Sequence, residues 1–194
     1  MNKRFAQRTH TEMKDVLMDP NAPTLNEHYY MIRGDNEDRN ITVWESGTVG
    51  DEYVKTYGHY HRGDGDETYW ILFGRGIALL QKRAVEGETP LSDSIEEFTV
   101  THINQGDMLF VPPRFGHCLV NTGPSFLVTA DNNVAHAQEG PASAPVENDY
   151  EPIKEMRGFA YYVIQHNGEP TLVKNSRYKN IQHEDLGGLP VVEL

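Results

Sequence analysis

Residues 58–70 read GHYHRGDGDETYW, and this stretch decides which fold and which chemistry to expect. Alternate residues of a β-strand face the same side, so His59 and His61 are expected to point together. A turn rich in Gly and Asp follows, and Glu67 opens the next apolar segment. If this turn closes a hairpin, Glu67 returns opposite the histidine strand. Two imidazoles and one carboxylate suit Fe, Mn, Ni, Co or Zn. The plainer interpretation is a polar strand followed by an acidic turn.

The flanking sequence predicts many short strands. Thr9 and Glu12 have the capping-box spacing, which favours a short helix over residues 9–19, ending before Pro20. Short β-type segments separated by Gly, Asn, Asp and Pro then follow, as is typical of an all-β sandwich or barrel. The stretch QHNGE at residues 165–169 predicts a hairpin turn. The predicted strands are 28–33, 40–46, 52–61, 67–73, 76–83, 95–103, 107–113, 117–122, 125–130, 159–165 and 170–175.

Two segments depart from the strand pattern. Residues 131–149, DNNVAHAQEGPASAPVEND, predict a loop insertion, which is either a lid over a binding site or a plain surface insertion. Residues 86–97, EGETPLSDSIEE, predict a solvated acidic loop. The chain as a whole, residues 1–194, is long enough for one sizeable core and is expected to be a single domain. Its N-terminal arm, residues 1–27, holds the short helix.

The composition excludes several classes of partner. A formal net charge of -12 argues against nucleic acid and anionic membranes, because both attract clustered Lys and Arg. The mean hydropathy is -0.61, and no stretch has the roughly 18 uninterrupted apolar residues of a membrane span. No apolar run follows the basic residues near the N-terminus, so we expect no secretory signal. The lone Cys118 fits a reducing compartment, and we expect a cytoplasmic protein.

A third histidine lies about fifty residues after the first two. A turn at Gly106, a strongly apolar strand and the bend Pro112–Pro113 lead to His117, which starts another strand. A histidine held behind such a rigid bend can supply a third imidazole to the same metal. Cys118 should then face away from the metal and pack as a small hydrophobic residue. His102 and His166 lie in strand or turn contexts and are expected at the surface.

Together these segments resemble the two cupin motifs. His59-x-His61, Glu67 and Gly74 have the spacing of the first motif, and Gly106, Pro112, His117 and Asn121 that of the second. Beyond the motifs, the chain resembles the cupin-type (archaeal) phosphoglucose isomerases over roughly residues 40–130 and 148–175. The segments that carry this likeness are ITVWESGTVGDEY, KTYGHYH, ETYWILFGRGIALLQ, FVPPRFGHCLVNTG and NDYEPIKEMRGFAYYVIQHNGEPTLVKN.

The resemblance implies a fold, an activity and a cofactor. The fold is the cupin double-stranded β-helix, a jelly-roll barrel. The activity is metal-dependent isomerisation between glucose 6-phosphate and fructose 6-phosphate, a step of glycolysis and gluconeogenesis. His59, His61, Glu67 and His117 would hold one divalent metal ion per subunit, foremost Fe, with Mn, Ni, Zn or Co as alternatives. A homodimer is expected by analogy with the family.

The same resemblance assigns the substrate residues. By position, Thr42, Thr56 and Gly58 match the phosphate-contacting residues of the family, and hydroxyl and amide donors suit a neighbourhood poor in lysine. Tyr69 follows Glu67 at period two and would orient the sugar hydroxyls. Glu67 is the candidate general base for proton transfer between adjacent carbons. A metal-assisted hydride shift is the alternative mechanism, and the sequence leaves both open.

The chain departs from the family pattern in two places. The spacer between His61 and Glu67 is one residue shorter than expected. The family's Tyr-Pro and Gly-His-Asp-Tyr segments have no direct counterpart, so two alignments compete. The family histidine matches either His136 or Asn148, and in the second alignment Tyr150 matches the family tyrosine. His136 and Tyr150 are therefore both candidate substrate-binding residues.

Two other functions remain open at this stage. One is a different cupin enzyme, such as a dioxygenase or an isomerase or epimerase that acts on another sugar. The other is a non-catalytic sugar-binding cupin. The complete four-residue ligand set favours an enzyme, and the matching positions Thr42, Thr56 and Gly58 favour a phosphorylated substrate.

Overall fold

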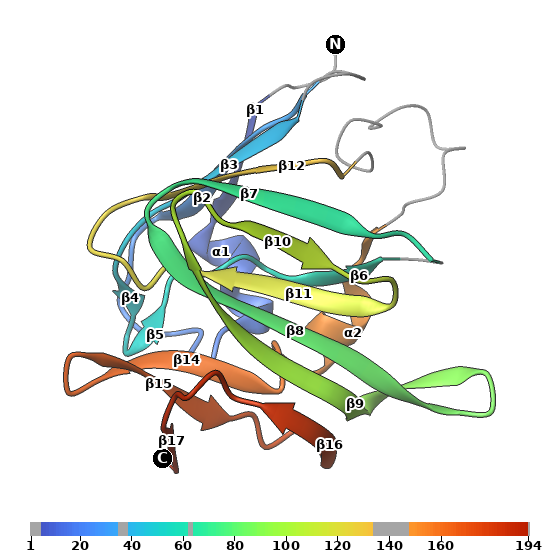
Figure 1. Cartoon of the computed structure of the whole chain (residues 1–194). Coiled ribbons are helices and arrows are strands. Elements are labelled where there is room, and N and C mark those ends of the chain that lie inside the picture. The colour runs from blue at the N-terminus through green and yellow to red at the C-terminus, as the bar shows by residue number, and fades with distance from the viewer. Residues whose placement is uncertain (1–4, 35–38, 62–63, 134–147, 194) are drawn as a thin grey trace.

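Two six-stranded sheets form most of the molecule (Figure 1). The computed structural model describes residues 5–34, 39–61, 64–133 and 148–193. The first sheet has the strand order β1-β2-β3-β12-β7-β10, and the second has the order β13-β6-β11-β8-β9-β16. Their bounds are β1 Phe5–Thr9, β2 Glu27–Ile32, β3 Asn40–Trp44, β6 His59–His61, β7 Glu67–Phe73, β8 Arg75–Glu86, β9 Thr89–Asn104, β10 Met108–Val111, β11 Phe115–Val120, β12 Leu127–Asp131, β13 Asn148–Asp149 and β16 Asn180–Asp185.

The chain passes repeatedly from one sheet to the other between β7 and β12. β7 belongs to the first sheet, β8 and β9 to the second, β10 to the first, β11 to the second and β12 to the first. β7 thus pairs with β10 and β12, whereas β8 pairs with β9 and β11. This interleaving is the jelly roll of the cupin double-stranded β-helix, so the fold expected from the resemblance is confirmed.

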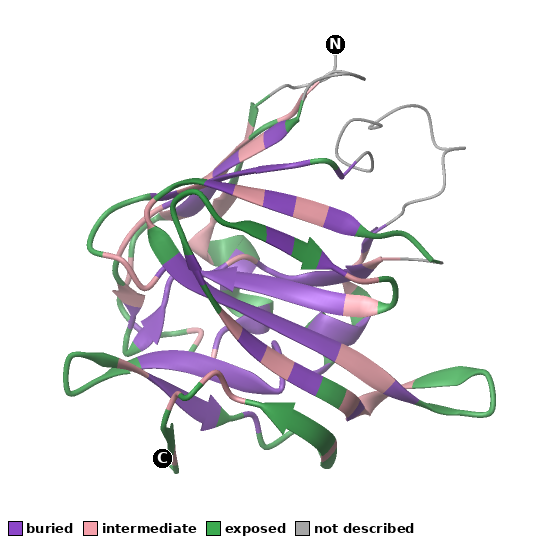
Figure 2. Ribbon diagram, viewed as in Figure 1, coloured by how far each residue is buried: buried purple, intermediate pink, exposed green. Residues whose placement is uncertain are grey.

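Alternating side chains explain why the two sheets pack together. In β7 the side chains of Glu67, Tyr69 and Ile71 are buried, while those between them are partly exposed. Such alternation turns one face of each sheet inward and leaves the other toward solvent. Figure 2 shows β8 and β11 buried along most of their length. Fully buried side chains of the core include Trp44, Ile71, Leu79, Phe98, Leu119 and Leu127.

A third, smaller sheet has the order β17-β15-β14-β5-β4. It joins β4 (Thr48–Val49) and β5 (Glu52–Tyr53) to β14 (Tyr161–His166), β15 (Glu169–Lys174) and β17 (Val191–Val192). The hairpin turn expected at 165–169 is confirmed, because His166 pairs with Glu169 and both turn residues have positive φ. A short helix, α2 (Glu151–Glu155), precedes β14 in the chain. No helix in the described part of the chain is long and apolar enough to cross a membrane.

A buried glutamine connects the barrel to the C-terminal segment. Gln81 of β8 is fully buried and donates to the hydroxyls of Tyr60 (2.7 Å) and Tyr178 (3.1 Å). Its amide oxygen accepts from the backbone N–H of Ala160 at 2.9 Å. Since buried amide groups are costly unless hydrogen-bonded, these contacts fix the segment after α2 against the barrel.

Two sequence predictions about strands and loops were wrong, and the predicted short helix is present but shorter than expected. The helix expected over 9–19 is α1 (His10–Met13) followed by a 3-10 turn (Lys14–Val16), although the Thr9 capping box is present. The predicted strand 52–61 is broken into β5, an isolated bridge at Lys55 and β6, since Gly58 has φ of 77°. The acidic stretch 86–97 is not a loop, because it continues the β8–β9 hairpin.

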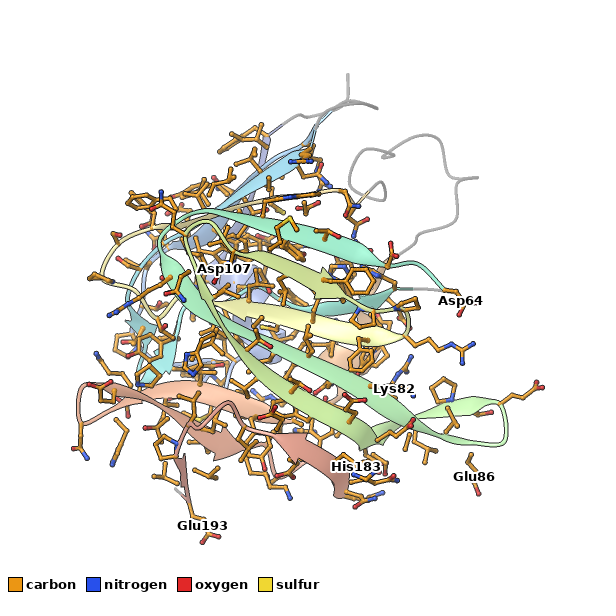
Figure 3. All side chains as sticks on the ribbon, viewed as in Figure 1. Asp64, Lys82, Glu86, Asp107, His183 and Glu193 are labelled. Carbon is orange, nitrogen blue, oxygen red and sulfur yellow. The ribbon has the colours of Figure 1, made fainter. Side chains whose placement is uncertain are left out.

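The shorter helix and the extended hairpin have physical causes outside the local sequence. The helix ends early because Lys55 Nζ donates to the carbonyl of Val16 (2.6 Å) and the N–H of Met18 donates to Glu52 (2.8 Å). Lys55 and Glu52 form a buried ion pair, so the chain after the helix is tied to that pair. The hairpin is extended because β9 also pairs with β16 near the C-terminus. Figure 3 labels Glu86 near the tip of this hairpin.

The prediction of a single domain over 1–194 stays a prediction. The insertion expected at 131–149 falls largely outside the described residues. Its first residue ends β12, and its last two form β13. His102 and His166 are exposed, and Cys118 is buried, as the sequence predicted.

The buried His28 should make stability fall in weakly acidic solution. Burial, with the nearby His10 and Lys55, lowers the pKa of His28 from 6.5 to about 4. Below pH 6.5 the unfolded chain therefore binds a proton that the folded chain resists. We expect His28 to leave the free energy of unfolding unchanged above pH 6.5. Between pH 6.5 and 4 it should lower that free energy by on the order of 3 kcal/mol. In denaturant unfolding, the free energy of unfolding of His28→Gln should fall less over this pH range than that of the wild type. The exposed-site control His102→Gln should follow the wild type. If the free energy of unfolding of both variants depended equally on pH, His28 would not be the residue responsible.

Candidate metal centre and pocket

Four side chains from the two sheets meet inside the barrel. His59 and His61 come from β6, and His117 comes from the neighbouring β11, where it pairs directly with His59. Glu67 comes from β7, which belongs to the other sheet. Each of the four offers one ligand atom, and these atoms all lie within 4.8 Å of one another. The four predicted metal ligands are therefore brought together.

The expected β6–β7 hairpin was nevertheless wrong. β6 pairs with β11 and β13, not with β7. The turn after His61 crosses from one sheet to the other, so Glu67 faces the histidines across the barrel interior. Figure 3 labels Asp64 at this crossing, and its carboxylate accepts from Arg114 Nε at 3.1 Å.

The Glu67 carboxylate is the centre of the cluster. Its Oε2 lies 2.9 Å from His61 Nε2 and 3.3 Å from His117 Nε2. The rings of His59 and His117 are 4.4 Å apart. Burial acts to raise the pKa of Glu67, but the neighbouring His117 and His61 outweigh it and hold that pKa below its ordinary value. The carboxylate is thus kept ionised inside the barrel.

The donors present fit a divalent metal ion. Glu67 is fully buried, and its Oε1 has no hydrogen-bond partner among the described residues. A buried ionised carboxylate is costly unless charge or hydrogen bonds compensate it. Three imidazoles and one carboxylate are the donors that Fe, Mn, Ni, Co and Zn accept. The carbonyl of Gly65 lies 3.3 Å from His61 Nδ1, which is the outer contact expected for a metal-binding histidine.

A pocket of about 500 Å³, its open mouth included, lies beside this cluster. His59 and His117 form part of its wall, whereas Glu67 and His61 lie behind that wall. Tyr69 also lines the pocket, and its hydroxyl is 3.0 Å from His117 Nε2. Burial and the Glu67 charge raise the pKa of Tyr69 well above its ordinary value, so this hydroxyl keeps its proton. Two of the predicted ligands, His59 and His117, and Tyr69 thus line a single pocket.

The other predicted substrate residues line the same pocket. Thr42, Thr56, Gly58 and Tyr150 all contribute to its wall. A side chain at Gly58 would lie 2.4 Å from the ring of Phe159, which with the positive φ explains the glycine. His136 lies outside the described residues.

Residues that sequence analysis missed also reach this pocket. Arg8, Arg33 and Asp131 line it, and none belongs to a motif with recognisable spacing. Burial and the Glu67 charge raise the pKa of Asp131 from 3.8 to about 7. Asp131 accepts a hydrogen bond from Asn40 Nδ2 at 2.7 Å. Only the pairing of strands remote in sequence brings these side chains to the site.

An amide network supports Glu67 from the side of β13. Asn133 Nδ2 donates to Glu67 Oε2 at 3.2 Å and to Asn148 Oδ1 at 3.3 Å. Asn148 Nδ2 in turn donates to the hydroxyl of Tyr150 at 3.5 Å. Tyr150 lies beside the ligand His59, with their rings 5.2 Å apart. Asn148 and Tyr150, the pair of the second alignment, are therefore part of the site's surroundings.

Fold and site together define an all-β cupin with one candidate metal centre beside a polar pocket. A family model described as glucose-6-phosphate isomerase (GPI) matches residues 7–181. The chain belongs to this glucose-6-phosphate isomerase family and is an isomerase by that membership.

Named relatives agree with this placement. The chain is 34% identical over 171 residues to the glucose-6-phosphate isomerase of Pyrococcus horikoshii, covering 84% of this chain and 78% of the relative. It is 33% identical over 191 residues to that of Thermococcus gammatolerans, covering 91% and 88%. Among solved structures, a predicted oxalate decarboxylase from Thermotoga maritima resembles it with a TM-score of 0.37, at 19% identity over 53% of this chain and 76% of that one. The Drosophila melanogaster CENP-C cupin domain gives a TM-score of 0.37 at 12% identity, covering 53% and 65%.

Removal of one ligand should release the metal. His59→Ala deletes one of three imidazoles without touching the buried carboxylate, so we expect metal occupancy after dialysis to fall at least about tenfold. His102→Ala, on the exposed face of β9, should keep the wild-type metal content. Elemental analysis of the purified variants measures both. Full occupancy in His59→Ala would show that the ligand set is wrong.

Proposed function

We propose that this protein interconverts glucose 6-phosphate and fructose 6-phosphate with one divalent metal ion per subunit, foremost Fe, held by His59, His61, Glu67 and His117. The single observation that carries the proposal is the meeting of these four side chains in one cluster, two of whose members, His59 and His117, line the same pocket as Thr42, Thr56 and Gly58. The family match supports the reaction, because the relatives are named for it.

The reaction makes definite demands on this pocket. From ketose to aldose, a C1–H bond breaks, a proton reaches C2, and a hydroxyl proton passes from O1 to O2. When bound, the metal ion would polarise the carbonyl oxygen and stabilise the charge that develops on it. Glu67 is the proposed general base for the carbon proton, and the Tyr69 hydroxyl is the proposed donor that orients the sugar oxygens.

Three further residues of the pocket wall suit a phosphate group. Thr56 Oγ1 accepts from the N–H of Leu119 at 3.1 Å, which leaves its own O–H proton to be donated. Gly58 adopts a positive φ that turns its backbone beside the pocket. Thr42 is buried in the pocket wall. We propose that these three residues contact the phosphate, with Tyr150 and His136 as further sugar contacts.

Two alternatives compete with this function. A different cupin enzyme would share the metal centre but act on another substrate, while a sugar-binding protein would bind without turnover. A buried ligand set with an uncompensated Glu67 oxygen favours a metal-dependent enzyme, because sugar binding alone gains nothing from such a costly arrangement.

A coupled assay of fructose 6-phosphate to glucose 6-phosphate tests the proposal. Metal-loaded protein should turn over, chelation should abolish activity, and add-back should restore it. Glu67→Gln should lower kcat by about 10²–10⁴-fold, the usual contribution of a positioned acid or base. Gln165→Glu, at the exposed end of β14, is a control for a similar amide–carboxyl exchange and should keep wild-type kcat. Metal-loaded protein without turnover would exclude the isomerase function and leave the cupin fold standing.

We also propose a homodimer in the cytoplasm, with the outer face of the first sheet as its interface. A cross-strand row of apolar residues spans all six strands of this face: Phe5, Ile32, Ile41, Ala130, Trp70 and Met108. Met108 is 70% exposed and Phe5 is 54% exposed. Exposed apolar patches of this kind commonly mark interaction surfaces.

Sedimentation velocity tests this interface. We expect the wild type to sediment as a dimer and Met108→Glu, which places a charge in the apolar row, to weaken dimerisation at least about tenfold. Val191→Glu places the same charge at an exposed position of the third sheet and should remain dimeric. A monomeric wild type would disprove the dimer, and an unaffected Met108→Glu would disprove this face.

A further inference from the structure

One cation reaches the pocket from the N-terminal strand, outside every motif of the sequence. Arg8 lies in β1, where it pairs with Tyr29 of β2. Its side chain lines the same pocket as Thr56 and Gly58. The sequence predicts only neutral hydroxyl and amide donors for the phosphate. Strand β1 adds a guanidinium to them.

The hydrogen-bonding capacity of Arg8 is not used up within the protein. Its guanidinium contacts the neutral Tyr29 hydroxyl, but its Nε is buried and has no hydrogen-bond partner among the described residues. Its acidic neighbour is Glu12, but the closest approach, Nη1 to Oε1, is 3.6 Å, which is too long for a hydrogen bond. The other oxygen of Glu12 accepts from the backbone N–H of Thr9 at 2.8 Å as part of the capping box. The guanidinium that lines the pocket is therefore not committed to a carboxylate, and its N–H groups can bind an anion there.

Aromatic side chains hold this guanidinium at the pocket wall. Its Cζ lies 5.8 Å from the ring centre of Tyr57 and 6.0 Å from that of Tyr150. Both rings also line the pocket. Such cation–π contacts restrict the side chain, so less entropy is lost when it binds an anion. The side chain is 30% exposed, which leaves it accessible to a ligand.

We propose that Arg8 binds the phosphate of the substrate and makes the pocket select phosphorylated over unphosphorylated sugars. The inference rests on the proposed function for the identity of the ligand, while the anion site itself rests on the geometry of Arg8. A guanidinium forms paired, charge-assisted hydrogen bonds with phosphate oxygens, and these are stronger than bonds from neutral donors. In a chain with a net charge of -12, a pocket cation also offsets repulsion of the dianion.

Two measurements on Arg8→Gln, Arg8→Lys and Arg177→Gln test the proposal. The first is KM and kcat for fructose 6-phosphate, and the second is calorimetric titration with inorganic phosphate, which needs no turnover. Arg177 is the matched control, because it is exposed between β15 and β16 and does not line the pocket. Thermal unfolding of each variant checks that it is folded.

We expect Arg8→Gln to raise KM and the phosphate Kd each about 10- to 100-fold with kcat within about threefold of wild type. Arg8→Lys keeps the charge but loses the paired N–H donors of the guanidinium, so its KM and phosphate Kd should lie between those of wild type and Arg8→Gln. Arg177→Gln should match wild type. Unchanged KM and phosphate Kd in Arg8→Gln would overturn the proposal, as would a loss of kcat with unchanged phosphate binding. If Arg8→Gln does not fold, Arg8→Lys becomes the test. A wild-type phosphate Kd in Arg8→Lys would then contradict paired hydrogen bonding between the Arg8 guanidinium and the phosphate.

The titration also separates this inference from the proposed function. Arg8-dependent phosphate binding in a protein that turns over no sugar phosphate would support the anion site and exclude the isomerase. Turnover of fructose 6-phosphate with a KM that does not depend on Arg8 would support the isomerase and overturn the role of Arg8.

Discussion

The position of Glu67 opposite three histidines is the constraint on which the rest of the site depends. The histidines lie on adjacent strands of one sheet, and the carboxylate lies on the other sheet. The ligand set therefore exists only when the barrel closes and the two sheets reach their native spacing. A bound metal ion would connect the sheets in addition to the apolar core, so metal binding and folding are expected to be coupled.

The surroundings of Glu67 join metal centre, pocket and C-terminal region into one unit. Asn133 connects the carboxylate to Asn148 at β13, and Asn148 connects to Tyr150 at the pocket wall. From the opposite side, the N-terminal strand brings Arg8 to the same pocket. Residues from Arg8 to Tyr150 thus line a site whose metal ligands lie between His59 and His117.

The sequence predicted those features that local patterns encode. The period of two in HYH and the Pro-Pro bend before His117 identified the ligands, and the turn residues separated most strands correctly. Contacts between distant segments were beyond such patterns. The crossing after His61 was mistaken for a hairpin because a Gly- and Asp-rich turn has the same composition in both cases. Arg8 and Asp131 were missed because only strand pairing with Tyr29 and Tyr69 brings them to the pocket.

The central claim is that His59, His61, Glu67 and His117 bind a single metal ion across the two sheets. Anomalous X-ray diffraction from crystals loaded with one divalent metal, measured at the absorption edge of that metal, tests it most directly. The account predicts one peak per subunit, at about 2.0–2.2 Å from an imidazole nitrogen of each histidine and from a Glu67 oxygen. A peak located elsewhere, or a fully loaded protein whose peak lacks Glu67 as a ligand, would contradict it.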